Sequence, residues 1–510
     1  MIIDARDLAH SELEADICIV GSGPAGLVIS RELSSTQASV LVLESGALGF
    51  DPDCQELNAG YVTGGSYNDL RLVRRRQVGG TVNIWNTNIG GNAAAKYVPL
   101  DPIDFESRSW LPHSGWPFGY DELAPYYHQA QVICGLGPLI YDADRWASSE
   151  LAPLRLDAGL IATRVYQFGT AAPFLDACIK KLHSSECIHL VQHATVTNLA
   201  MNHDTDRVSA ATIVVPGRNK AIRLQARTFV LACGAIENAR LLLLATGSKR
   251  CRPGNEHDLV GRFFMEHPRD YALTLTPARN SFLEEAAFYD QHRGADGTVI
   301  MGRLALTTEI LRESRLLQAS ATLIPTFSPP SNLTQKVKKL FLRRRRNGLG
   351  DYPRTGSGWS GRSDRIGGMR LLLNLEQAPK RDNRIVLSRE RDSLGCSRVN
   401  LHWTWTKHEQ AELERTRRVF AGALESAGYG SVRLEELTPD PNAHHHAGTT
   451  RMHADPRLGV VDADSRVHGV ENLFVVGASV FPTAGFANPM LTIVALAARL
   501  GDRLRRTQRA

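Results

Sequence analysis

Two short apolar runs near the start of the chain enclose a glycine-rich segment and a helical pattern. The first run, Asp16–Val20, is mostly apolar and is followed directly by GSGPAGLVISREL. The second run, Ala38–Gly46, reads ASVLVLESG and ends beside an acidic side chain. Apolar runs of this length, bounded by glycine, are typical of strands that are buried on both faces. The order strand, helix, strand predicts the beginning of a parallel α/β sheet.

The pattern changes several times beyond this unit. Residues 60–92 are rich in Gly, Asn and Arg and predict a long ordered loop, which in a compact domain is usually functional. Residues 269–439 alternate more strictly and carry many turn residues, which predicts antiparallel sheet. We also expect sheet from residue 188 to about 234, a helix from Tyr120 to Cys134, a strand in NLFVVGA, and a helix from Met490 to Leu504.

The length of the chain predicts that it is divided into domains. A single hydrophobic core stops growing at roughly 250–300 residues, so 510 residues predict about two domains. We expect an α/β fold in which a Rossmann-like, dinucleotide-binding domain is interleaved with a substrate domain built on a mainly antiparallel sheet with helices. The first domain takes residues 1–95, 190–268 and 440–510, and the second takes residues 96–189 and 269–439.

Composition and charge exclude several classes of protein. The net charge of +6 is mild for this length and does not indicate a nucleic-acid partner. No stretch approaches the roughly 18 uninterrupted apolar residues of a membrane helix. The N-terminal sequence MIIDARDLAHSELEAD lacks a cationic leader region. Eight scattered cysteines form neither a C-x-x-C pair nor a zinc-ligand spacing. These features predict a cytoplasmic protein without a membrane span.

A basic stretch, KVKKLFLRRRRNGLG, spans Lys336–Gly350. A run of like charges is most often a solvated loop, and that is the interpretation we favour. The alternative is a docking patch for a membrane surface or an acidic partner.

The segment after the first strand carries a nucleotide-binding fingerprint. Gly21, Gly23 and Gly26 form G-x-G-x-x-G, in which the first glycine permits a tight turn, the second lets the backbone approach a pyrophosphate, and the third allows close helix–strand packing. The following helix offers free N–H groups to the phosphates. Glu44 lies 18 residues after Gly26 (44 − 26), where a carboxylate can accept hydrogen bonds from ribose hydroxyls. The fingerprint alone does not separate NAD from FAD.

The C-terminal block is more specific. It reads HHHAGTTRMHADPRLGVVDADSRVHGVENLFVVGASVFPTAGFANPMLTIVALAARLGDRL. Together with the fingerprint, it resembles the glucose–methanol–choline (GMC) family of flavin oxidoreductases, on its pyranose-oxidase and glycoside-oxidase side. Further matching segments are RRRQVGGTVNIWN (Arg74–Asn86), FVLACGAIENARLLL (Phe229–Leu243), GRFFMEHP (Gly261–Pro268) and EQAPKRDNRIVL (Glu376–Leu387).

The resemblance implies FAD as the cofactor, so that the dinucleotide-binding domain is an FAD-binding domain. It implies His445 as the catalytic base, in the motif H-x-x-G-T, and Asn488 as its partner before the last helix. Ile84 stands where covalent members carry histidine, which implies non-covalently bound FAD, and Asn86 is expected near flavin N5. The full set of expected cofactor contacts is Gly21, Gly23, Pro24, Ala25, Gly26, Glu44, Ser45, Arg76, Gly79, Gly80, Thr81, Asn86, Val196, Ala232, Gly234, Gly477, Ala478, Asn488, Pro489, Met490 and Thr492.

Histidine and asparagine side chains suit the oxidation of an alcohol by hydride removal. Hydride removal from an alcohol carbon requires loss of the hydroxyl proton, and a neutral imidazole accepts a proton near neutral pH. An amide can hydrogen-bond the same oxygen as charge develops. The helix after Pro489 offers its positive end to the reduced flavin. Three adjacent histidines, His444–His446, rarely reach one ion, so we expect no metal.

Expectations also extend to residues outside the main motifs. We expect Glu237 and Asn238 near the ADP moiety, and Val196 to lend backbone groups to the adenine. We expect His267 to have a structural role. The acidic residues Glu284, Glu285 and Asp290 suggest a site for a cationic amino sugar, although acidic surface loops are common.

The sequence therefore predicts an FAD-dependent enzyme that oxidises a CH–OH group of a sugar, glycoside or sugar-like natural product. Its partners are a small-molecule alcohol or sugar and an electron acceptor that is oxygen or unknown, without nucleic acid. The alternatives are a sterol or simple alcohol as substrate and a flavin-bound lyase of the same family. A non-catalytic flavoprotein would need neither His445 nor Asn488. A nicotinamide-dependent enzyme would lack the yellow colour of flavin.

Overall fold

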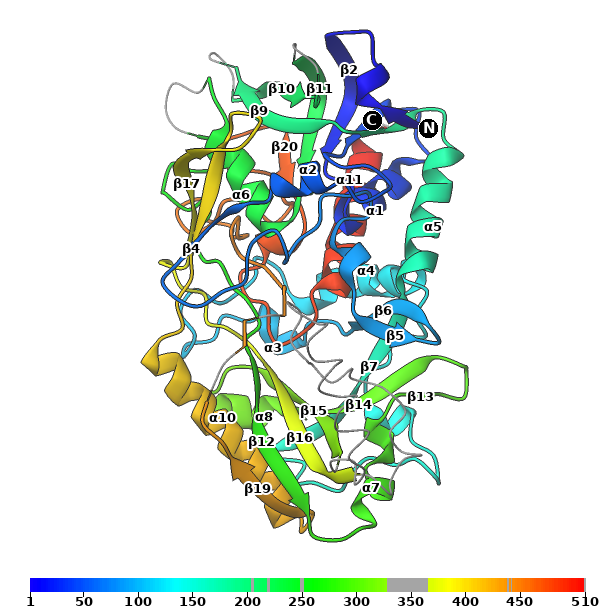
Figure 1. Cartoon of the computed structure of the whole chain (residues 1–510), viewed down its shortest axis with the longest axis vertical. Helices are drawn as coiled ribbons and strands as arrows, with labels where there is room; N and C mark the ends of the chain where they lie inside the picture. The colour runs from blue at the N-terminus through cyan, green and yellow to red at the C-terminus, as the bar shows by residue number, and fades with distance from the viewer. Residues whose placement is uncertain are drawn as a thin grey trace, which may run out of the picture.

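The computed structural model describes residues 1–202, 206–217, 221–247, 252–327, 366–437, 440–441 and 443–508. The basic stretch Lys336–Gly350 lies outside the described residues. Two large sheets lie at opposite ends of the molecule, and both chain termini lie near the sheet drawn at the top of Figure 1. None of the helices within the described ranges combines the length and apolar character needed to cross a membrane.

The first large sheet has eight strands and contains the predicted parallel unit. β2 (Glu12–Val20) pairs in parallel with β3 (Val40–Leu43) and with β11 (Ile222–Leu231). The strand order is β1 (Ile2–Asp4), β8 (Ile188–Gln192), β3, β2, β11, β10 (Val208–Val214) and β9 (Thr195–Met201), with β20 (Leu473–Val475) also on β11. The predicted strands near both ends of the chain are confirmed, and only the β9–β10–β11 edge is antiparallel.

The second large sheet has nine strands, and all its pairings are antiparallel, as the alternating pattern predicts. Its order is β19 (Gly430–Leu434), β12 (Arg269–Pro277), β16 (Ile366–Leu375), β15 (Ala319–Phe327), β14 (Val299–Leu306), β7 (Ile161–Thr170), β6 (Asn92–Tyr97) and β5 (Thr87–Ile89), with β13 (His292–Arg293) on β14. The expected domain boundary at residue 95 falls inside β6, because the β5–β6 hairpin pairs with β7.

The prediction of an unbroken loop over residues 60–92 is wrong in part. This segment holds β4 (Gly60–Thr63), a short 3₁₀ helix η2 (Gly80–Ile84) and β5. β4 joins β18 (Ser397–His402) in parallel, and β18 joins β17 (Arg384–Arg391). A strand this short depends on a partner more than three hundred residues away, so its own sequence carries little signal.

The helices cover the parallel sheet and flank the second one (Figure 1). α1 (Pro24–Leu33) packs against the C-terminal helix α11 (Met490–Thr507), which also packs against α4 (Tyr120–Ile133). The predictions for α4 and α11 are confirmed to within a few residues. The other α-helices within the described ranges are α2 (Pro52–Glu56), α3 (Pro102–Phe105), α5 (Ala171–His183), α6 (Gly234–Leu244), α7 (Phe282–Glu285), α8 (Thr308–Glu313) and α10 (Lys407–Ser426).

A buried ion pair ties together distant segments around the second sheet. Both Nη atoms of Arg108 donate to the carboxylate of Glu376, at 2.8 and 2.5 Å, and the side chains are 1% and 0% exposed. The backbone N–H of Gln318 donates to the same carboxylate at 2.9 Å. Since the two charges pair with each other in a buried place, loss of the Glu376 charge leaves the Arg108 guanidinium without its ion-pair partner.

We therefore expect Glu376→Gln to lower the free energy of unfolding by about 3–5 kcal/mol, since removal of one member of a buried pair carries this cost. Chemical denaturation of purified variants measures the change. Glu106→Gln is the matched control, because Glu106 pairs with Arg312 at side chains that are 42% and 48% exposed, and exposed pairs contribute about 0–1 kcal/mol. Equal effects of the two substitutions would contradict a structural role for the buried pair.

Candidate active site

A cavity of about 1060 Å³ brings most of the predicted site residues together. This volume lies slightly above the usual range for ligand pockets, roughly 300–1,000 Å³, and leaves room for a long ligand together with a second molecule. One end is lined by the glycine fingerprint and the other by His444, His445 and His446. Of the expected cofactor contacts, the lining includes Gly21, Gly23, Pro24, Ala25, Glu44, Ser45, Arg76, Gly80, Thr81, Asn86, Val196, Ala232, Gly234, Gly477, Ala478, Asn488, Pro489 and Met490.

Three expected contacts do not line the cavity. Gly26 lies behind the turn, where an added Cβ would come within 2.0 Å of the Gly21 carbonyl oxygen. Gly79 adopts a left-handed conformation, with φ of +90°, and its N–H donates to Ser22. Thr492 points toward α4, where its hydroxyl lies 2.9 Å from that of Tyr127. These residues shape the site from outside, because each packs against protein.

The fingerprint glycines have separate geometric roles. Gly21 has φ of +100°, and its Cβ would meet the Ala232 carbonyl oxygen at 2.8 Å. Gly23 has ordinary extended angles, φ −68° and ψ −177°, and an added Cβ would meet nothing closer than 3.9 Å. Gly21 and Gly26 therefore serve the turn and the packing, whereas Gly23 leaves open space at the start of α1. That opening is where the backbone can approach a phosphate group.

Glu44 is held at the end of β3 as a hydrogen-bond acceptor. Its Oε2 accepts from the N–H and hydroxyl of Ser22, at 3.0 and 2.7 Å, and its Oε1 accepts from the N–H of Gly46 at 3.0 Å. A carboxylate offers about four acceptor positions. These three bonds fix its orientation and leave capacity for a hydroxyl of a bound ribose.

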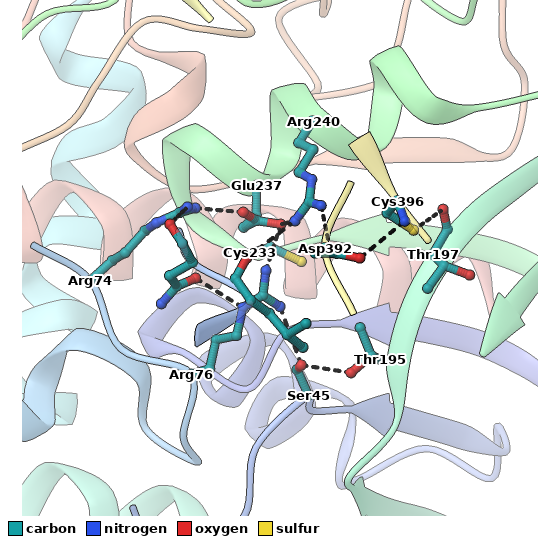
Figure 2. A network of polar contacts seen from close by, with 12 residues as sticks. Ser45, Arg74, Arg76, Thr195, Thr197, Cys233, Glu237, Arg240, Asp392 and Cys396 are labelled. Carbon is teal, nitrogen blue, oxygen red and sulfur yellow. Dashed lines mark hydrogen bonds and ion pairs between the residues drawn. The ribbon is translucent and has the colours of Figure 1, made fainter. Parts of the chain in front are cut away.

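Guanidinium groups surround the same end of the cavity (Figure 2). Glu237, in the first turn of α6, forms ion pairs with Arg74 at 2.5 Å and Arg76 at 2.8 Å, and Arg240 lies 3.4 Å from it. Although burial opposes it, these charges hold the pKa of Glu237 well below its usual range. Arg240 also pairs with Asp392 at 2.6 Å. Glu237 thus positions Arg74 and Arg76 in the wall of the cavity. Their positive charges favour an anionic ligand at this end of the cavity.

Asn238 lies near the start of α6, where β11 leads into the helix, as expected of a residue at a strand-to-helix turn. Asn238 is fully buried beneath the cavity wall rather than part of it. Its Oδ1 accepts from the N–H of Cys233 at 2.8 Å, and its Nδ2 donates to Ser479 at 2.9 Å. The side chain ties the start of α6 to the segment after β20, because both of its polar atoms are bonded to these neighbours.

At the other end, His445 is held between two side chains. Asn488 Nδ2 donates to His445 Nε2 at 3.1 Å, and the Nδ1 atoms of His445 and His267 lie 2.9 Å apart. An amide nitrogen donates only, so Nε2 of His445 is the acceptor and its proton resides on Nδ1. His267, predicted to be structural, therefore lies in direct contact with the His445 ring. No spacing in the sequence marks this pairing, because the two residues are 178 positions apart.

Glu266 anchors the histidine segment through its backbone. One carboxylate oxygen accepts from the N–H of His445 at 2.7 Å and of His267 at 2.8 Å. The other accepts from the hydroxyl of Tyr67 at 2.6 Å, and that hydroxyl accepts from Nε2 of His446 at 2.8 Å. Burial raises the pKa of Glu266 to about 7, against the opposing effect of these hydrogen bonds.

The three adjacent histidines are neutral at pH 7. Burial, followed by the charges of His267 and Arg269, lowers the pKa of His445 well below 6.5. Burial likewise lowers the pKa of His444 to about 4 and that of His446 well below its usual range. Within the described part of the chain, no group of three His, Cys, Asp or Glu side chains is arranged to hold a metal ion. Neutral imidazoles can accept a proton, so the site is arranged for base chemistry.

The acidic residues considered for an amino sugar lie elsewhere. Glu285 pairs with Arg279 at 2.6 Å, and Asp290 accepts from the N–H of Gln291 at 2.8 Å. Neither these two nor Glu284 is among the cavity-lining residues that the structure describes. Five residues that line the reaction end were not predicted, because no sequence motif marks them. They are Lys96, Arg269, Tyr271, Leu372 and Asn374.

Comparison with known proteins agrees with this arrangement. Residues 379–497, which include His445 and Asn488, match the family model described as GMC oxidoreductase. The chain is similar to paromamine 6'-oxidase of Streptomyces fradiae, at 26% identity over 97% of this chain and 92% of that protein. It is also similar to the fructose dehydrogenase large subunit of Gluconobacter japonicus, at 24% identity over 97% and 98%. A solved structure of Aspergillus oryzae RIB40 formate oxidase has a TM-score of 0.56 at 15% identity, covering 98% of this chain and 99% of that one.

The fold and the cavity define a dinucleotide-binding type of protein with a neutral histidine in the cavity wall. In its C-terminal part the chain is similar to the glucose–methanol–choline (GMC) oxidoreductases. It is an FAD-dependent enzyme that acts on CH–OH donors. The cavity fits FAD, because it joins an opening at Gly23, a ribose acceptor at Glu44 and two guanidinium groups to the reaction end.

The opening at Gly23 gives a test of where FAD binds. We expect Gly23→Ala to fold normally, since its backbone is extended and its Cβ has room, and to weaken FAD affinity by at least about tenfold because the methyl group occupies phosphate space. Fluorescence titration of the apoprotein with FAD measures the affinity. Gly119→Ala is the matched control, because Gly119 also precedes a helix with extended angles and an open Cβ position, outside the cavity. Unchanged affinity in Gly23→Ala would place the phosphates elsewhere.

Proposed function

We propose that this enzyme oxidises a hydroxyl-bearing carbon of a sugar, glycoside or sugar-like natural product to a carbonyl, with His445 as the base. The observation that carries the proposal is the neutral Nε2 of His445, which faces Asn488 in the wall of the cavity that also holds the nucleotide fingerprint. The hydroxyl oxygen of the substrate would lose its proton to this nitrogen, and the carbon that bears this oxygen would lose a hydride, so that a C=O bond forms. FAD, when bound, supplies the hydride acceptor.

Each neighbour of His445 has a role in this step. Asn488 donates toward the position where the substrate oxygen must lie, so its amide stabilises the alkoxide that develops. His267 and Glu266 fix the imidazole ring and its backbone, so that Nε2 rather than Nδ1 points at the substrate. We propose that both act through His445 as positioning residues.

The lining of the reaction end supports a polyhydroxylated substrate. It offers hydrogen-bonding groups from Asn86, Thr87, Asn88 and Asn374. Such groups can form hydrogen bonds with the hydroxyl groups of a polyhydroxylated substrate. Paromamine 6'-oxidase and the fructose dehydrogenase large subunit, similar over almost the whole chain, have carbohydrate-type substrates in their names. A sterol or simple alcohol is the second candidate.

The base is tested by substitution. We expect His445→Ala to retain FAD and to reduce the rate by about 10²–10⁴-fold, the usual contribution of a general base. Stopped-flow reduction of the bound flavin under anaerobic conditions, with a panel of sugars and alcohols, measures the rate and identifies the substrate class. His128→Ala is the control, because His128 is an exposed residue of α4. Near-normal reduction by His445→Ala would reject His445 as the base, and a flavin that no alcohol bleaches would favour the lyase alternative.

We also propose that FAD is bound without a covalent link. Ile84 lines the cavity at the position where the resemblance places a linking histidine, and its side chain has no nucleophile. Acid precipitation should therefore release all the yellow colour into the supernatant, as judged by its visible spectrum. Flavin that remains in the protein pellet would show a link through another lining residue.

A further inference from the structure

Lys96, on β6, is a buried lysine that lines the cavity. The residue is 8% exposed, and its Nζ lies 5.0 Å from the centre of the Tyr166 ring. Within the described part of the chain, no carboxylate forms an ion pair with it and no group accepts a hydrogen bond from it. Buried lysines are normally paired. This one opens onto a ligand cavity, so its partner is expected to come from the bound molecule.

The second sheet connects Lys96 to the catalytic centre. The hydroxyl of Tyr166, under the lysine, accepts from Asn374 Nδ2 at 3.3 Å. Asn374 is the direct neighbour of Arg269 in the β16–β12 pairing. Arg269 follows His267, the ring partner of the proposed base, by two residues, and both Asn374 and Arg269 line the cavity. Lys96 therefore belongs to the reaction end rather than to the nucleotide end.

The charges at the two ends of the cavity differ. Among the described lining residues, the acidic ones are Glu44 and Glu237, and both lie at the nucleotide end. The reaction end carries Lys96 and Arg269, and Arg269 forms an ion pair with Asp440 at 2.7 Å. The positive charge of Lys96 thus has no compensating charge among the described residues that line the cavity. Burial, and then the nearby charge of Arg269, lowers the pKa of Lys96 to about 7; an anion beside the lysine would offset both effects.

We propose that Lys96, with Arg269 beside it, binds a carboxylate of the substrate, so that the molecule oxidised is a sugar acid or an acidic glycoside. This inference rests on the proposed function and names its substrate class. A single uncompensated charge matches a monoanion. An amino sugar would bring a like charge against Lys96, and a neutral sugar would leave the ammonium group without a charged partner.

Paired ligands test the charge preference directly. Calorimetric titration of the holoenzyme under anaerobic conditions measures the affinity for each sugar acid and for its neutral partner. The pairs are D-glucuronate and D-glucose, D-galacturonate and D-galactose, and D-mannuronate and D-mannose. The two members of each pair differ at C6. We expect at least one acid to bind about tenfold or more tightly than its neutral partner, as a charge-assisted hydrogen bond predicts. Lys96→Met should abolish this advantage. Lys96→Arg should retain part of it, and Lys181→Met, at an exposed position of α5, should leave it unchanged.

Two results would overturn the carboxylate site at Lys96. In the first, no acid binds more tightly than its neutral partner. In the second, Lys96→Met has a normal FAD content and still binds the acid more tightly. Bleaching of the flavin separates this failure from failure of the proposed function. A holoenzyme that neutral sugars bleach, but that shows no preference for acids, retains the function and rejects the carboxylate site.

Discussion

The hydrogen bonds that the Glu266 carboxylate accepts join the two segments on which the reaction end is built. The segment before β12 and the histidine segment meet as a short antiparallel bridge, in which the backbones of Met265 and Ala447 exchange bonds of 3.0 Å. A bridge this short does not fix the orientation of the side chains beyond it. Glu266 adds acceptors for the N–H groups of His267 and His445, so both rings are aimed by one carboxylate. A buried carboxylate is tolerated here because several N–H and O–H groups donate to it.

This arrangement places the Glu266 carboxyl group at the backbone of the histidine segment rather than on the ring of His445. The two ring partners of His445, Asn488 and His267, are both uncharged at pH 7, since burial lowers the pKa of His267 to about 4. A base oriented by a carboxylate on its ring would have a higher pKa and would be partly protonated near neutrality. Here the ring is oriented by neutral groups and remains an acceptor.

The sequence predicted the parts of the site that depend on local geometry. Gly21 and Gly26 were recognisable because a turn and a close helix–strand contact tolerate no side chain. His445 and Asn488 were found through the resemblance, and the structure places them 3.1 Å apart. Lys96, Asn374 and the β4 pairing could not be found this way, because their partners come from strands far away in the chain. Gly79 and Thr492 do not line the cavity, and the sequence could not show this, because a motif does not show which way a residue faces.

The electrostatics of the cavity bear on the proposed proton transfer. Burial and neighbouring positive charge lower the pKa of His445, so negative charge near the ring would favour its protonation. The N-terminus of α11 faces the cavity at Pro489 and Met490, where it would stabilise the negative charge of a reduced flavin if FAD binds as proposed. A carboxylate held by Lys96 and Arg269 would fit this scheme, since it neutralises the fixed positive charge that otherwise opposes the protonation of His445.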